Sequence, residues 1–164
     1  MKSALRVIAL TGLLAACTQP AETQATSATA APKGFDATSP YSNYELTMER
    51  IDAMLVAQSY LAAAVKDDPT LEVAMKAASG EDGVRYAARL EATPALRDAI
   101  AKSGLSTRDY ALTSEALMTA LMTQEALTAG RLKAIPHGVN RQNVYFVREH
   151  KDALAARFAG YQQR

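Results

Sequence analysis

The chain of 164 residues has one cysteine, two histidines and no tryptophan, and aromatic residues make up only 6% of it. A single cysteine excludes an internal disulfide, so a folded core must come from packing alone. Two histidines exclude zinc sites that are built on several histidine ligands. The formal net charge of +1 gives no strong field that would attract nucleic acid, and we expect no nucleic-acid partner.

Several motifs that carry chemistry are also missing. The sequence contains no H-E-x-x-H zinc motif, no glycine-rich phosphate loop and no C-x-x-C-H haem attachment site. We therefore expect a protein that is not an enzyme and that uses no cofactor. Alanine and leucine are plentiful, and such residues lose little conformational freedom in helices.

The first 17 residues have the organisation of a bacterial export signal. Lys2 and Arg6 precede a short apolar run over 7–14, which is too short to span a bilayer. The run ends in Leu-Ala-Ala-Cys at 14–17, which resembles the lipobox of bacterial lipoproteins. That resemblance implies cleavage before Cys17, with residues 1–16 as signal peptide, and acylation of Cys17 to form a membrane anchor. The alternative is an ordinary secretory signal with a chance cysteine.

Position 18 bears on the location of the anchor. In Gram-negative lipoproteins, the resemblance with Thr18 rather than Asp implies sorting to the outer membrane, facing the periplasm. Residues 17–40 then comprise the lipidated cysteine and a linker rich in Ala, Thr and Pro without apolar periodicity. Such a composition predicts a flexible, disordered tether, followed by a folded domain over 41–164.

The remaining sequence predicts an all-α bundle of about four to five helices. Apolar positions recur at 3-4 spacing from Tyr44 to Val65, and Asp68-Pro69 and Thr93-Pro94 are typical helix starts. Ser106 opens an apolar helix near 107–130, which we expect at the centre of the bundle. Asn140 is expected to cap a last helix that runs to about 158.

A second resemblance concerns this helical part. The stretches "PALRDAIAKSGLSTRDYALTSEALMTALM" and "NVYFVREHKDALAA" are similar to those of a group of small, secreted, all-helical bacterial proteins of unknown function. The likeness covers roughly residues 44–158. It implies a helical fold and supplies no site.

One stripe on the predicted central helix has residue types that bind ligands. Carboxylates and thioethers at 3-4-3 spacing project from one face, and His150 on the last helix follows an apolar stripe that would turn it inward. One interpretation of this set is a soft-metal, haem or small-ligand site; its members are Glu115, Met118, Met122, Glu125 and His150. Alternatively, the methionines fill the core, and the acids reach solvent or pair with Lys or Arg. Glu115 as the general base of an enzyme is a third hypothesis.

Charge is distributed unevenly along the chain. Residues 36–82 carry nine acidic and three basic side chains, whereas residues 131–164 carry seven basic and two acidic ones. The basic end is predicted either to meet anionic lipid headgroups or an acidic partner, or to pack against the first helix so that the charges compensate. Together the patterns favour a lipid-anchored, non-catalytic binding module of the cell envelope, with the membrane and an envelope protein as partners.

Overall fold

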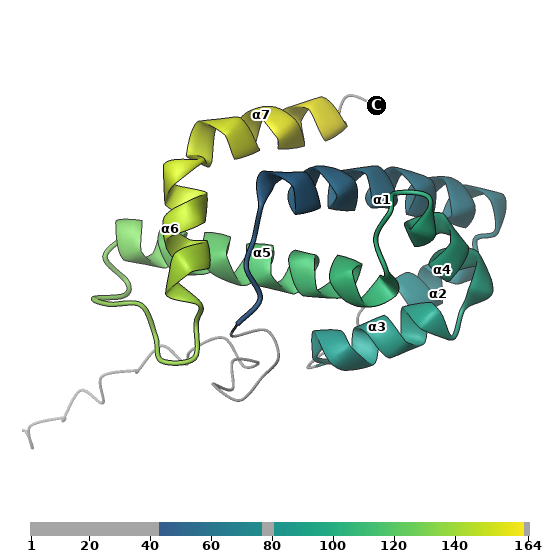
Figure 1. The fold of residues 1–164 in the computed structure, drawn as a ribbon, viewed down its shortest axis with the longest axis horizontal. Coiled ribbons are helices and arrows are strands. Elements are labelled where there is room, and N and C mark those ends of the chain that lie inside the picture. The colour runs from purple at the N-terminus through teal and green to yellow at the C-terminus, as the bar shows by residue number, and fades with distance from the viewer. Residues whose placement is uncertain (1–42, 77–80, 163–164) are drawn as a thin grey trace, which may run out of the picture.

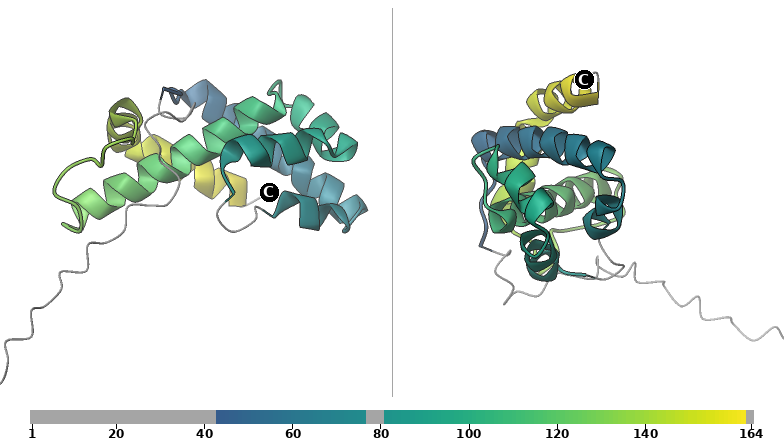
Figure 2. Two further views of the ribbon diagram at one scale, coloured as in Figure 1. Left: turned by 90° about the horizontal axis from the view of Figure 1, so that it is seen from below. Right: turned by 90° about the vertical axis from the view of Figure 1, so that its right-hand side faces the viewer.

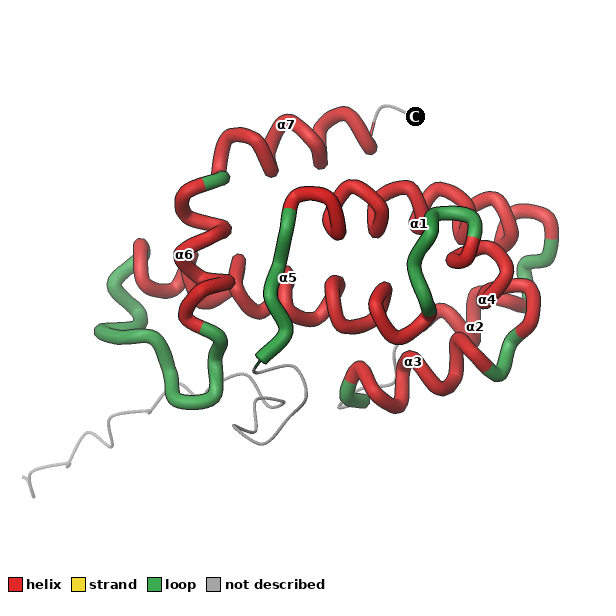
Figure 3. The backbone as a smooth tube through the Cα atoms, viewed as in Figure 1, coloured by secondary structure: helices red, strands yellow, loops and turns green. Residues whose placement is uncertain are grey.

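The computed structural model describes residues 43–76 and 81–162, and every regular element in these ranges is a helix (Figure 3). The expected all-α class is confirmed. The predicted signal peptide, the lipidated Cys17 and the linker lie outside the described residues. The seven described helices are α1 (Met48–Asp67), α2 (Leu71–Met75), α3 (Gly83–Glu91), α4 (Pro94–Ala101), α5 (Thr107–Thr128), α6 (Arg141–Glu149) and α7 (Lys151–Gln162).

Helix α5 lies at the centre of the bundle, as its apolar sequence predicts (Figures 1 and 2). It packs against α1, α3, α4 and α6. Helix α3 runs antiparallel to the first half of α5, because Gly83 bonds to Glu115 at one end and Glu91 bonds to Thr107 at the other. Large side chains from all sides fill the interior; those with almost no exposed surface are Ile51, Leu61, Leu90, Leu96, Ile100, Val144, Val147 and Leu154.

The helix boundaries follow local capping. Ser106 accepts from the Asp109 N–H at 3.0 Å, which starts α5 where the sequence predicts. Gly130, just after the end of α5, has φ +70°, a conformation that glycine adopts without steric cost. The expected start of the first helix at Tyr44 is wrong. Thr47 caps α1, so Tyr44 lies in a non-helical segment, which we call the lead-in segment (residues 43–47).

Two other expected boundaries also differ from the structure. The short second helix begins at Leu71 and not at Pro69, because the Asp68 side chain bonds to Thr70 and closes a turn first. The last helix is divided at His150 into α6 and α7. This break lets α7 lie over α1, where Arg157 forms a two-bond ion pair with Asp52 at 2.6 and 3.3 Å.

A buried asparagine of α6 fixes the lead-in segment. Asn143 is only 3% exposed, and its side-chain oxygen accepts from the Leu46 N–H at 2.9 Å while its nitrogen donates to the Tyr44 carbonyl at 2.7 Å. Asn140 donates to the same carbonyl at 3.2 Å. The amide of Asn143 thus bonds to the backbone as a neighbouring strand would, and it satisfies two polar groups that lie at the edge of the core. We call this arrangement the Asn143 clamp.

Replacing Asn143 by alanine should destabilise the domain strongly. The Asn143→Ala variant leaves the Leu46 N–H and the Tyr44 carbonyl without this partner, and one unsatisfied buried group costs about 1–3 kcal/mol. We expect the free energy of unfolding to fall by about 2–4 kcal/mol in urea titrations. The exposed neighbour Gln142 provides the control, since Gln142→Ala should shift stability by less than about 0.5 kcal/mol. Equal effects of the two substitutions would contradict the clamp.

Candidate functional site

The predicted stripe on α5 faces solvent along most of its length. Met118 is 60% exposed and Met122 is 52% exposed, so neither fills the core as one interpretation expected. Apolar side chains occur on nearly every side of α5, and the sequence pattern therefore does not indicate which side is left uncovered. The two thioethers form an exposed apolar surface on the central helix.

Glu115 has a structural task at the inner end of this stripe. Its carboxylate accepts a 3.0 Å hydrogen bond from the Gly83 N–H, the first residue of α3. Burial raises the pKa of Glu115, the Gly83 N–H opposes this rise, and the nearby charge of Asp82 adds to it. A carboxylate at a helix N-terminus satisfies an N–H that has no partner within the helix. Glu115 therefore fastens the start of α3 to α5.

The other two ligand candidates, Glu125 and His150, each contact a different residue. Glu125 is exposed and pairs with Arg131 at 2.9 Å, as the charge-pairing alternative predicts for this stripe. The expectation that His150 points inward is wrong. His150 is exposed at the junction of α6 and α7, and its ring lies 4.5 Å from the Phe146 ring, centroid to centroid. Within residues 43–76 and 81–162, no group of three or more His, Cys, Asp or Glu side chains is placed to hold a metal ion.

A buried tyrosine of the central helix lies close to side chains of two other helices. Tyr110 of α5 is 4% exposed, and burial raises the pKa of its hydroxyl well above the usual value, with a further rise from Tyr86 of α3. The nearby Gln58 side chain in α1 offsets part of that rise. Tyr110 thus remains a neutral phenol whose role is to link the helices.

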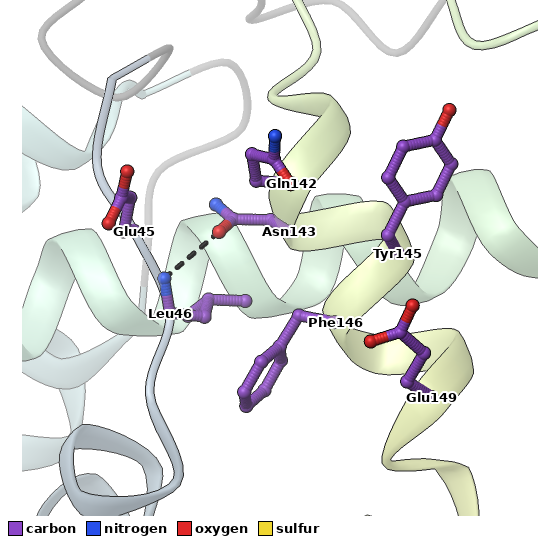
Figure 4. Close-up of a pocket in the computed structure, with 7 residues that line it drawn as sticks. All are labelled: Glu45, Leu46, Gln142, Asn143, Tyr145, Phe146 and Glu149. Carbon is purple, nitrogen blue, oxygen red and sulfur yellow. Dashed lines mark hydrogen bonds between the residues drawn. The ribbon is translucent and has the colours of Figure 1, made fainter.

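A polar hollow lies between the lead-in segment and α6 (Figure 4). It has a volume of about 330 Å³, with the carboxylates of Glu45 and Glu149 on its walls. In the close-up, Tyr145 projects away from the lead-in segment, whereas Phe146 lies near Leu46. Asn143 also lines this hollow, and its side-chain amide is already hydrogen-bonded to the backbone of the lead-in segment.

A more apolar groove lies between α1 and α7. It has a volume of about 410 Å³, and the exposed side chain of Val56 on α1 forms part of its wall. A Cβ atom added at Gly160 would meet no other atom within 4 Å, so the groove is open above this residue. Its lining comprises Asp52, Leu55, Val56, Ala156, Arg157, Gly160 and Tyr161. We call it the α1–α7 groove.

The sequence did not predict this groove, because its two walls are about 100 residues apart in the chain. Asp52 and Arg157, which join the walls, are separated by 105 positions. The signals available were the glycine in the last helix and the apolar pair Val56 and Tyr60. Neither is specific without the placement of α7 over α1, which depends on the break at His150.

Comparison with protein-family models, curated proteins and solved structures gives no match for this chain. Both resemblances drawn from the sequence thus stay predictions. Among the helices described, none has the length and apolarity required to traverse a bilayer.

Replacing Glu115 by glutamine should change the pH dependence of stability. The folded protein holds the Glu115 proton more tightly than the unfolded chain, whose pKa is near 4.5. The free energy of unfolding therefore falls as pH rises from that value through the folded pKa. Glutamine keeps an acceptor for the Gly83 N–H but does not titrate. Relative to wild type, Glu115→Gln should gain stability between about pH 4 and pH 7 in urea titrations.

The exposed neighbour Met118 provides the matched control for this experiment. The Met118→Leu variant carries no titrating group, so its stability profile should run parallel to that of wild type. A parallel profile for Glu115→Gln as well would show that Glu115 titrates alike in the folded and unfolded chains.

Proposed function

We propose that this protein is a lipid-anchored bacterial lipoprotein whose helical domain binds another protein of the cell envelope and does not catalyse a reaction. In a Gram-negative source the anchor lies in the outer membrane and the domain faces the periplasm. The observation that carries the proposal is the N-terminal sequence, in which a charged segment, a short apolar run and two small residues precede the sole cysteine. Several acyl chains on one residue would give a stable anchor, whereas one chain binds only marginally.

The α1–α7 groove supports a binding role for the domain. Exposed apolar surface beside a concave groove is typical of protein interaction sites. Tyr161 offers the kind of aromatic area that dominates many interfaces, and the Asp52–Arg157 ion pair forms a polar rim. The groove fits one or two apolar side chains from an amphipathic helix of a partner protein.

The alternative functions receive no such support. Glu115 is engaged with α3, Glu125 is paired with Arg131, and His150 contacts Phe146, so these groups are each held by other contacts. A haem, metal or small-ligand site on this stripe stays a prediction. The same holds for Glu115 as a general base, because its hydrogen bond to the backbone already gives it a structural role.

Replacing Cys17 by alanine tests the anchor. The thiol is the atom to which the lipid would attach, so the Cys17→Ala variant should lose all incorporation of radiolabelled palmitate and should leave the membrane fraction. The Thr18→Ala variant keeps the thiol and should remain labelled. Palmitate labelling and membrane partition that persist in Cys17→Ala would refute the lipoprotein assignment.

Substitutions in the α1–α7 groove test the interaction. In cells treated with a cross-linker, wild-type protein should give a heavier adduct. Val56→Glu places a charge in the groove, and Gly160→Leu fills the open space there, so each should reduce the adduct by about tenfold. Val73→Glu is the matched control, because Val73 is 79% exposed on α2 and lies outside the groove. Loss of the adduct in Val73→Glu, or its persistence in both groove variants, would contradict the assignment.

A further inference from the structure

The segment between α5 and α6 has a one-sided charge. Residues 129–142 contain Arg131, Lys133 and Arg141 and no acidic residue. Arg131 pairs with Glu125, but Lys133 and Arg141 are exposed and form no ion pair within the described part of the chain. We call the exposed part of this segment, which includes Lys133, His137 and Arg141, the basic loop surface.

The α6 end of this segment lies beside the point where the described chain begins. Asn140 of this segment donates to the Tyr44 carbonyl, and Asn143 holds the next residues of the lead-in segment. The ribbon views agree that the loop before α6 and the start of the lead-in segment lie near one another (Figures 1 and 2). Only 25 residues, 18–42, separate Cys17 from Asn43.

A further cation lies near the lead-in segment. Arg50 donates to the Glu45 carbonyl and lies 4.8 Å from the Tyr44 ring centroid, which adds a positive charge near the lead-in segment. Asp67 and Asp68 lie at the other end of α1, at the opposite end of the molecule in Figure 1. Glu45 of the lead-in segment and Glu149 of α6 line the hollow of Figure 4.

We propose that the basic loop surface docks on anionic phospholipid headgroups of the membrane that holds the Cys17 anchor. This inference rests on the proposed lipid anchor. Headgroup phosphates attract exposed lysine and arginine side chains, and the attraction is screened by salt. Two or three cations bind weakly alone, but a tether of limited length holds them at high effective concentration near the membrane. Docking in this orientation turns the acidic end of α1 toward the aqueous phase.

The test uses full-length lipidated protein in vesicles. Because lipid consumes the Cys17 thiol, a cysteine introduced at exposed Ala134 or Ala63 is the sole free thiol and accepts a fluorophore. Ala134 lies in the basic loop, and Ala63 lies toward the far end of α1. Quenching by nitroxide-headgroup lipid reports the distance of each label from the membrane.

In vesicles of phosphatidylcholine with phosphatidylglycerol, the Ala134 label should be quenched at least about threefold more than the Ala63 label. The difference should vanish in phosphatidylcholine alone and at high salt. Lys133→Gln with Arg141→Gln should abolish it. The matched control is Arg97→Gln with Lys102→Gln, which removes two exposed cations from the α4 region and should leave the difference intact.

The outcomes separate this inference from the proposed function. Protein that incorporates palmitate but shows equal quenching at both positions, or a difference that survives Lys133→Gln with Arg141→Gln, overturns the docking alone. Protein that incorporates no palmitate overturns both the anchor and the docking.

Discussion

The hydrogen bonds between Asn143 and the backbone of the lead-in segment hold the start of the described chain against α6. The amide of Asn143 pairs with Leu46 and Tyr44, residues almost 100 positions earlier in the chain. The hydroxyl of Tyr44 in turn lies 2.9 Å from Thr113 on the central helix. One segment is thus tied to α6 and α5 before α1 begins. Because an unpaired backbone group at the edge of the core is costly, this geometry is strongly specified.

The Asn143 clamp fixes where on the domain the described chain begins. It places the start of the described chain beside the basic segment between α5 and α6, whereas the break at His150 sends α7 back over α1. The α1–α7 groove and the basic loop surface therefore come from different parts of the fold. Such a separation is compatible with a domain that faces its membrane with one surface and a protein partner with another.

The sequence predicted the helical class, the central position of α5 and its start at Ser106, because capping and apolar periodicity are local signals. The pairing of Glu125 with a base is one of the alternatives that the sequence left open. The exposure of Met118 and Met122 was not predicted, since α5 is apolar on nearly every side. The uneven charge predicted, as one alternative, that the basic end packs against the first helix, and the Asp52–Arg157 ion pair agrees with it. The role of Asn143 and the shape of the α1–α7 groove depend on contacts across about 100 residues that no local pattern indicates. Whether Cys17 is acylated stays a prediction from the N-terminal residues.

Hydrogen exchange at the Leu46 amide tests the clamp most directly. Leu46 precedes α1, so its N–H has no partner within that helix, and it donates instead to the side chain of Asn143. If the clamp is part of the cooperative core, this amide exchanges as slowly as that of Ile51 inside α1, through the same opening of the structure. Exchange at the rate of an unprotected loop amide, while Ile51 stays protected, would show that the lead-in segment is not held and would contradict this account.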